Sequence, residues 1–459
     1  MDYLPVGNRA GCVAYIYGVN HTNRKITLLQ ATSINMIDMV GIGPFVVIPF
    51  VVSQFDNGLF LWAWIFGAFA ALMDGMIWAE LGARYPLAGG TYNFHRIAFG
   101  EKGGRLMSFL FVWQTSIQAP LVVASGAIGF AQYLSYLVDL SSIQQKMVSG
   151  GLIILVLLLL YRRIETIGKI SVVLGSIVIL TICWIIVSGL THQHHAVHLL
   201  PEGGGSFFST AFIAAIGYGS LKTVYSYLGY YNVCHLGGEI KNPGVNIPRS
   251  IFISIFGIAT LYLLMNFSIM SVVPWQSVRA DDKYLVSSFM ELVYGRQAAI
   301  IITVLILMIA LASLFAVVLG YSRVPYAAAL DGNFFPAFKK LHPTKQFPYI
   351  SLLFLCGIAF VFSLLLRLGD VITAILAMRI LIQFIGQSAG LVLLRLKFGT
   401  SELPFRMWLY PLPVIVSMAI WMFLFVSTGW FALYGVGIAC TGLVIYFAVN
   451  NRRKISSVS

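Results

Sequence analysis

The chain has 459 residues, of which 59% are hydrophobic and 10% are charged, and its formal net charge is +13. So much apolar sequence excludes a soluble multidomain protein and predicts an all-α polytopic membrane protein. The net charge would also suit a nucleic-acid partner, so the positions of the basic residues decide between the two explanations.

Twelve apolar stretches are long enough to cross a bilayer. They cover residues 28–53, 59–81, 104–137, 147–163, 167–190, 207–236, 248–273, 296–326, 349–366, 370–395, 406–427 and 430–450. With the N-terminus inside, 21 lysines and arginines fall on the cytoplasmic side and 5 on the opposite side. This asymmetry follows the positive-inside rule, so the basic excess sets the topology and no nucleic acid is expected. We predict a multi-pass protein of the inner or plasma membrane, with cytoplasmic segments 1–27 and 451–459 at its ends.

The first span, LLQATSINMIDMVGIGPFVVIPFVVS, makes a poor continuous helix. Gly41 and Gly43 each cost about 1 kcal/mol relative to alanine in a helix interior, and Pro44 removes an amide that would bond to Val40. We therefore expect two half-helices, with Pro44 at the start of the second one.

This break is a candidate binding site, because unpaired backbone at membrane depth persists only where it lines a cavity. The positive dipole end of the second half-helix would face an anion, and the carbonyl groups that end the first would face a cation. A kinked helix packed through small residues is the alternative.

Two ionisable residues lie inside the second and fifth spans. Asp74 needs a partner or a water-filled pocket, so it is either a structural hydrogen-bond anchor or a site residue. Lys169 lies about one turn inside the membrane, from where its side chain can snorkel to the cytoplasmic surface. Alternatively, its ammonium occupies a cation site at the carbonyl groups released by the first break and acts in proton coupling.

The sixth span also contains an interruption, because Gly229 sits between Tyr227-Leu228 and Tyr230-Tyr231. It follows the first span by five spans, so the two halves of the chain would have opposite topologies. Glycine-interrupted helices in corresponding places of inverted halves indicate a site at their interface. In the same span, Lys222 either pairs with Asp38 or Asp74 or attracts an anionic group.

The remaining polar positions carry no catalytic pattern. The four histidines of residues 192–198 suit a solvated loop better than a metal site. Arg379, Gln383 and Gln387 recur at helical spacing and predict a polar stripe that faces the interior of the bundle. No combination of nucleophile, base and orienting residue is present, so we expect neither an enzyme nor a metal or other cofactor.

Three ordered motifs resemble the amino acid/polyamine/organocation superfamily of secondary transporters. DMVGIGPF, through residues 41–45, resembles the break in the first helix of that family. WAELGARYPLAGGTYNF, through residues 80–92, resembles the signature that follows the second helix. YSYLGYYNVCHLGGEIKNPGVNIPRS, through residues 239–248, is similar to the segment of the sixth helix.

This resemblance implies a leucine-transporter-like fold with twelve transmembrane helices. One transporter domain (28–450) would contain two inverted five-helix repeats (28–190 and 207–395) and two accessory helices (406–450). Helices 1 and 6 would be broken at the midplane of the membrane.

The resemblance also implies roles for individual residues. The backbone of residues 40–43 would bind the substrate carboxylate, and the carbonyl groups near Tyr227 and Leu228 would bind its ammonium. Tyr230 occupies the position of an aromatic gate, and Lys169 matches a lysine that some members use in place of a bound sodium ion. The implied substrate-binding residues are Asp38, Val40, Gly41, Ile42, Gly43, Tyr227, Leu228 and Gly229.

The sequence therefore predicts a sodium-independent amino acid permease that works by alternating access, through proton coupling or exchange. Asp38 stands where many amino acid carriers have a small or neutral residue, which makes a polyamine or organic-cation carrier the alternative. A receptor or channel without transport is a more remote one. Besides substrate and membrane lipid no partner is expected, because loop 138–146 has no cysteine for a disulfide to a single-span subunit.

Overall fold

The structure is a computed structural model that describes residues 24–456 except 57, 163, 201–206, 208, 283, 367 and 402. The predicted N-terminal segment 1–27 lies largely outside these residues. Helices and their connections make up the described chain, with two isolated bridges, from Ile26 to Ile240 and from Ala88 to Leu236. The α-helices are α2 (Leu28–Met39), α3 (Gly43–Val52), α4 (Leu61–Arg84), α5 (Thr91–Ala98), α6 (Gly100–Leu134), α7 (Ser142–Leu160), α8 (Ile164–Thr191), α9 (Thr210–Tyr227), α10 (Asn232–His235), α11 (Pro243–Met270), α12 (Leu285–Tyr294), α13 (Arg296–Tyr321), α14 (Arg323–Leu330), α15 (Tyr349–Leu365), α16 (Leu368–Arg379), α17 (Gly386–Phe398), α18 (Leu412–Ser427) and α19 (Ala432–Ser456).

Within the described residues, eight helical segments are long and apolar enough to cross a membrane, and the bent pair α2 and α3 makes a ninth. Three further apolar helices, α12, α15 and α18, are shorter. Lengths and composition of this kind confirm the prediction of a polytopic, all-helical membrane protein.

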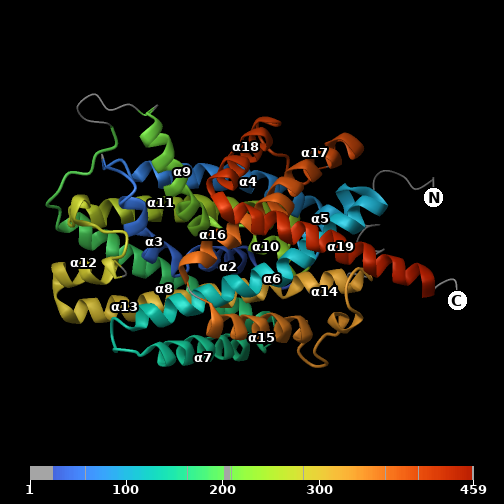
Figure 1. Cartoon of the computed structure of the whole chain (residues 1–459), viewed down its shortest axis with the longest axis horizontal. Helices are drawn as coiled ribbons and strands as arrows, with labels where there is room; N and C mark the ends of the chain where they lie inside the picture. Colours follow the sequence, from blue (N-terminus) through green and yellow to red (C-terminus); the bar gives the residue numbers. More distant parts are fainter. Residues whose placement is uncertain are drawn as a thin grey trace.

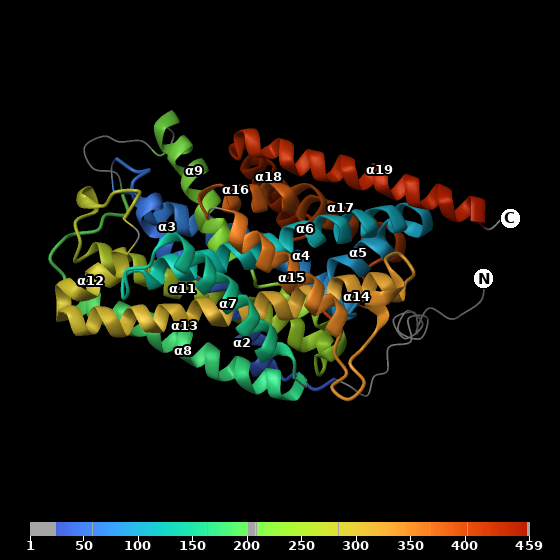
Figure 2. The ribbon, with the colours of Figure 1, turned by 60° about the horizontal axis from the view of Figure 1, so that its bottom comes forward.

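The helices form one bundle around α2, which contacts α8, α11 and α13. α4 packs against α9 and α11, and α6 packs against α13 and α15. Figures 1 and 2 show most helices running along the long axis of the molecule, with α19 on the outside. Buried apolar side chains from almost every helix join in one continuous core, and the pocket described below lies inside it.

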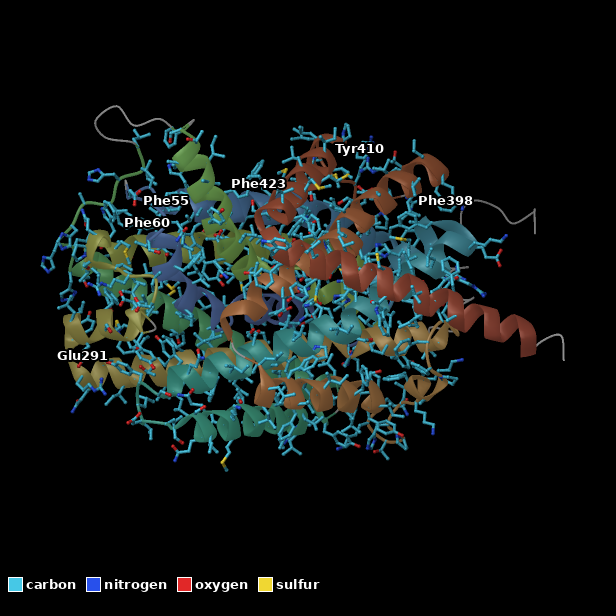
Figure 3. The ribbon with its side chains drawn as sticks, viewed as in Figure 1. Phe55, Phe60, Glu291, Phe398, Tyr410 and Phe423 are labelled. Atoms are coloured by element: carbon cyan, nitrogen blue, oxygen red, sulfur yellow. The ribbon has the colours of Figure 1, made fainter. Side chains whose placement is uncertain are left out.

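At one end of the bundle α5 contacts α6, α14 and α17, and these four helices carry Arg96, Arg105, Arg323 and Arg395. Phe398 lies at this end and Glu291 lies at the other (Figure 3). We call it the basic end.

The first predicted break is confirmed. Thr27 caps α2, since its Oγ1 accepts a hydrogen bond from the Gln30 amide while its own amide donates to Gln30 Oε1. The helix ends at Met39, and α3 begins at Gly43 with Pro44 in its first turn, at an angle of 45° to α2. Proline is tolerated there because the first amides of a helix have no partner within it.

The second predicted interruption is also present. α9 ends at Tyr227, Leu228 is extended, and Gly229 has a φ of +125°, a conformation that side-chain-bearing residues rarely adopt. The chain resumes at Asn232 as the single turn α10.

The predicted tenth span (370–395) is less regular than its spacing indicated. α16 ends at Arg379 and passes into a π-helical segment, Ile380–Ile385, before α17 begins. A π-helical turn inserts extra backbone and rotates the residues before it relative to those after it. Arg379, Gln383 and Gln387 consequently have different neighbours, although all three are buried as predicted.

Candidate functional site

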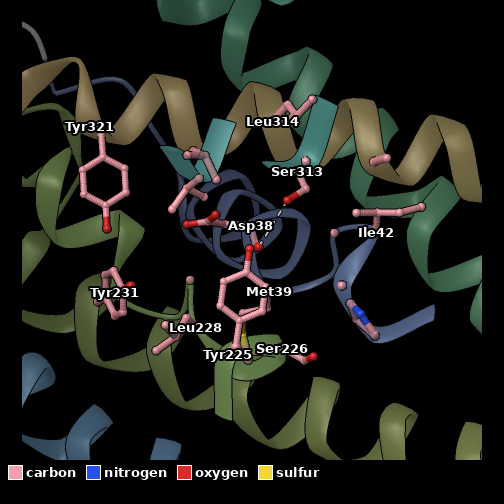
Figure 4. A pocket seen from close by; sticks show the side chains of 18 of the residues that line it. Asp38, Met39, Ile42, Tyr225, Ser226, Leu228, Tyr231, Ser313, Leu314 and Tyr321 are labelled. Atoms are coloured by element: carbon pink, nitrogen blue, oxygen red, sulfur yellow. Dashed lines mark hydrogen bonds between the residues drawn. The ribbon is translucent and has the colours of Figure 1, made fainter. Parts of the chain in front are cut away.

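The pocket lies where the two helix breaks face each other (Figure 4), and its volume is about 60 Å³. Its walls come from both breaks and from α6, α13 and the end of α16. The lining residues are Asp38, Met39, Gly41, Ile42, Gly43, Pro44, Val122, Gly126, Tyr225, Ser226, Leu228, Gly229, Tyr231, Ala310, Ser313, Leu314, Val317, Tyr321 and Arg379.

The N-terminal turn of α3 forms one wall. Gly41, Ile42 and Gly43 lead into this 10-residue helix, and all three line the pocket. A Cβ atom on Gly41 would lie 2.7 Å from Ser313 Oγ, so a side chain at this position would displace the Ser313 hydroxyl of α13. Because the first amides of a helix point outward and its dipole is positive there, this wall suits a carboxylate.

The carbonyl ends of α2 and α9 form a second wall. The Tyr262 hydroxyl of α11 lies 2.9 Å from the Met39 carbonyl oxygen and 3.2 Å from that of Ser226, so it joins the two helix ends. Asp38 lines the same part of the pocket, and Ser313 Oγ donates to its backbone carbonyl over 3.4 Å. Carbonyl ends and a carboxylate together favour a cation such as an ammonium group.

A buried guanidinium forms the third wall. Arg379, at the end of α16, is 3% exposed, and its Nη1 donates to the Tyr231 hydroxyl over 2.9 Å. Its Nη2 donates to the Tyr321 hydroxyl. The sequence predicted that Arg379, Gln383 and Gln387 all face the interior of the bundle. It did not indicate which of the three would line a pocket. Neither glutamine lines the pocket.

Six of the eight predicted substrate-binding residues line this pocket. They are Asp38, Gly41, Ile42, Gly43, Leu228 and Gly229. The other two, Val40 and Tyr227, are fully buried behind it. The ring of Tyr227 packs against those of Trp64 and Tyr262, so it supports the second break from outside the cavity.

Tyr230 and Asp74 meet away from the pocket. Asp74 accepts hydrogen bonds from the Tyr230 hydroxyl (2.6 Å) and the Trp78 indole (2.9 Å) on one oxygen. Trp421 (3.1 Å) and Ser417 (3.3 Å) donate to the other oxygen. Four donors around one carboxylate match the anchor alternative for Asp74. The gate role of Tyr230 stays a prediction, and the aromatic residue that lines the cavity before the second break is Tyr225.

Lys222 lies elsewhere. Its ammonium donates to Thr373 Oγ1 over 3.3 Å and lies 5.4 Å from the ring centre of Phe50. Its role as a charge partner of Asp38 or Asp74, or as a site for an anionic group, stays a prediction.

Lys169 is exposed and does not line the pocket. Gly168 and Gly175 on the same helix touch α2 at Gln30 and Ser33. Lys169 lies on a different, exposed stripe of α8, with Val173 and Leu180. Its coupling role stays a prediction, and this placement suits a side chain that reaches the membrane surface.

The side-chain region of the pocket was missed from the sequence. It comprises Val122, Gly126, Ala310, Ser313, Leu314 and Val317 from α6 and α13. These small and apolar residues look like any other membrane-spanning sequence, so only the tertiary packing identifies them. Tyr231 and Tyr321 were missed for the same reason.

Three ion pairs join helices at the basic end. Glu80 pairs with Arg395, Arg96 pairs with Asp331 and Glu239 pairs with Arg323. The backbone carbonyl of Glu239 also accepts hydrogen bonds from the amides of Lys25 and Ile26, just before α2. These contacts join the start of α2 to the loop after the second break and to α14.

The charges around the pocket suit a small organic ion. Among the described residues, no group of three or more histidine, cysteine or acidic side chains is close enough to hold a metal ion. A positive helix end and a negative wall within one small cavity instead match a molecule with both charges.

The sequence as a whole matches one family. The family model of the amino acid permeases matches residues 26–450. The serine/threonine exchanger SteT of Bacillus subtilis (strain 168) is 26% identical over 453 residues, which cover 95% of this chain and 98% of that relative. The branched-chain amino acid permease BcaP of the same organism is 23% identical over 465 residues, 96% of each chain. Cationic amino acid transporter 4 of Mus musculus is 25% identical over 400 residues, 83% of this chain and 60% of the relative. Because the family model covers nearly the whole chain, the protein belongs to the amino acid permeases of the amino acid/polyamine/organocation superfamily.

Proposed function

We propose that the protein is a secondary transporter that carries amino acids across the membrane by alternating access. The observation that supports this most directly is the meeting of the two breaks at one small pocket. Its α3 wall suits a carboxylate and its carbonyl wall suits an ammonium, and these are the two charges common to all amino acids. Gly41, Gly43 and Gly229 would be the hinges, because they interrupt the helices on both sides of the pocket.

A twelve-span architecture follows if the broken and short helices are counted as spans. The eight long segments, the α2–α3 pair, the interrupted helix α9, and the shorter apolar helices α15 and α18 would together make twelve crossings. The first repeat would then run from α2 to α8 and the inverted repeat from α9 to α17, each opening with its broken helix. The basic end would face the cytoplasm. The protein would lie in the inner or plasma membrane of the cell.

Exchange or proton coupling without sodium is the proposed energy source. Exchange is suggested by the relative SteT, which is named a serine/threonine exchanger. Sodium independence comes only from the sequence resemblance of Lys169 to a lysine that replaces sodium in some relatives, since the side chain is exposed and does not line the pocket.

A carrier of cationic amino acids or polyamines is the second candidate. Asp38 in the pocket supports it, as does the similarity to a protein named a cationic amino acid transporter. Arg379 opposes it, because a second cation in the same cavity would be repelled at low dielectric.

Counterflow into proteoliposomes tests the proposal. Vesicles loaded with an unlabelled amino acid mixture should take up labelled amino acid by exchange, without sodium in the buffer. Empty vesicles and vesicles without protein serve as controls. If no amino acid of any class exchanges while the purified protein still binds one, a receptor replaces the transporter as the explanation.

A further inference from the structure

Arg379 has unused hydrogen-bonding capacity inside the pocket. A guanidinium has five N–H donors, and in this structure Nη1 and Nη2 each use one on a tyrosine hydroxyl. Its Nε is buried and has no partner among the described residues. Among the described residues no carboxylate lies within 4.0 Å of it, and the Asp38 carboxylate interacts with it electrostatically from across the pocket. A buried cation in this condition strongly favours an anionic ligand with two oxygen atoms.

The guanidinium and the α3 wall are separate anion sites. Figure 4 shows Ile42, next to the start of α3, on one side of Asp38, and Tyr321 and Tyr231 on the other. Those two tyrosines hold Arg379. Asp38 and the carbonyl ends of α2 and α9 therefore lie between a positive helix end and a positive side chain.

This order of charges matches one class of amino acid. An acidic amino acid carries two carboxylates with an ammonium close to one of them. The α3 wall would bind the α-carboxylate, the Asp38 wall would bind the ammonium, and Arg379 would bind the carboxylate of the side chain. The region between is lined by Gly126, Ala310 and Ser313, which leave room for a short carbon chain.

The charge of Arg379 also disfavours cationic substrates. A long cationic side chain or a polyamine would bring a second positive charge to the guanidinium, which repels it at low dielectric.

We propose that Arg379 makes this pocket selective for short dicarboxylic amino acids, aspartate first, by binding the side-chain carboxylate. This inference rests on the proposed transport function and adds the substrate class. It also assigns Tyr231 and Tyr321 as the residues that hold the guanidinium in position.

Substrate competition in proteoliposomes tests the wild-type protein. Counterflow of labelled aspartate is expected, with strong inhibition by unlabelled aspartate, weaker inhibition by glutamate, and none by lysine or putrescine. Exchange of serine or lysine without any exchange of aspartate would overturn the selectivity while leaving the transport function intact. A complete lack of exchange would instead contradict the proposed function itself.

Variants of Arg379 separate a binding role from a structural one. Arg379→Gln is expected to lower the ratio of aspartate to serine transport about 10- to 100-fold, as expected for loss of a charge-assisted contact. Arg379→Lys keeps the positive charge but cannot donate two parallel hydrogen bonds to one carboxylate. Its ratio of aspartate to serine transport should lie between those of wild type and Arg379→Gln. Arg296→Gln, an exposed arginine far from the pocket, is the matched control and should leave the ratio unchanged.

An equal loss of aspartate and serine transport in Arg379→Gln would assign the residue a structural role and overturn the proposal. If that variant does not assemble, Tyr321→Phe provides the second test. It removes one contact to the guanidinium and keeps the charge, so it should raise the KM for aspartate more than that for serine. An equal fold-change in KM for both substrates, relative to wild type, would also count against the proposal.

Discussion

Gly229 of the second break lies directly against the backbone of Asp38 at the first break. A Cβ atom at residue 229 would fall 2.7 Å from the Met39 amide nitrogen and 2.8 Å from the Asp38 carbonyl carbon. Both are main-chain atoms that cannot rotate away. Residue 229 must therefore be glycine for two reasons, the lack of space for a Cβ atom and the φ of +125°.

Gly229→Ala should accordingly abolish transport and lower the stability of the protein. The backbone conformation alone costs about 1 to 3 kcal/mol with a side chain present, and the overlap with α2 adds to this. Gly357→Ala is the matched control, since a Cβ atom there meets nothing within 4 Å. Thermal unfolding in detergent and amino acid counterflow would be measured on both. Normal transport by Gly229→Ala would show that the two breaks need not touch.

Asp74→Asn should lower the stability of the bundle, although Asp74 does not line the pocket. The side-chain amide of Asn has an NH₂ group where Asp74 has one of its two oxygens. This NH₂ group would face two hydrogen-bond donors that then have no acceptor, which lowers the free energy of unfolding by about 2 to 4 kcal/mol. Tyr230→Phe removes one of the four donors and should cost less. The same variant tests the gate, because an anchoring role predicts lower thermal stability with an unchanged KM, whereas a raised KM would favour a gate.

Breaking the Glu80–Arg395 pair should be among the most destabilising changes at the basic end. Glu80 is fully buried and accepts from Arg395 Nε over 2.7 Å and from the Met407 amide over 2.8 Å. Arg395→Gln would leave a buried carboxylate without its cation, at a cost of about 3 to 5 kcal/mol. Arg296→Gln breaks an exposed pair with Glu291 and should cost less than about 1 kcal/mol. Chemical denaturation in micelles compares the two, and similar losses would refute the burial argument.

The stability of the protein should fall in mild acid because of His95. This residue of α5 is fully buried between the rings of Phe99 and Phe111, and burial lowers its pKa from 6.5 to about 4. The unfolded chain therefore binds a proton that the folded chain does not between these two values. Above pH 6.5 His95 is neutral in both states and does not lower the free energy of unfolding. As the pH falls toward 4, protonation of the unfolded chain lowers the free energy of unfolding by up to about 3 kcal/mol.

His95→Gln should flatten this pH dependence. Melting temperatures from pH 7.5 down to pH 4.5 would be compared for wild type, His95→Gln and His194→Gln, an exposed control. Parallel curves for wild type and His95→Gln would remove His95 as the cause.

Lys169→Ala distinguishes the two roles considered for this lysine. Because the side chain lies on the exposed stripe of α8, we expect exchange and uphill accumulation to stay close to wild type. Loss of accumulation with preserved exchange would restore the coupling role and would require a conformation in which α8 turns Lys169 toward α2.

Local backbone chemistry explains which parts of the site could be predicted from the sequence. Gly41, Gly43 and Pro44 interrupt a helix wherever they occur together, and Gly229 permits a conformation that other residues avoid, so both breaks were predictable. The twofold occurrence of such breaks then indicated a shared site. These inferences need no knowledge of neighbouring helices.

The third wall depends on tertiary packing and could not be derived this way. Tyr225 and Tyr230 are both aromatic and close to Gly229, but the turn at that glycine directs the first into the cavity and the second toward Asp74. Arg379 was recognisable as buried. Its place in the pocket depends on how α16 packs against α6 and α9, which the sequence does not show.

Tyr262 carries a single hydroxyl hydrogen for two acceptors, the carbonyl groups of Met39 and Ser226. It can satisfy only one of them fully at a time. If either helix end moved away in the proposed transport cycle, the same proton would remain available to the end that stays. Separation of the two ends would therefore cost at most one hydrogen bond, and α11 would stay bonded to the other end.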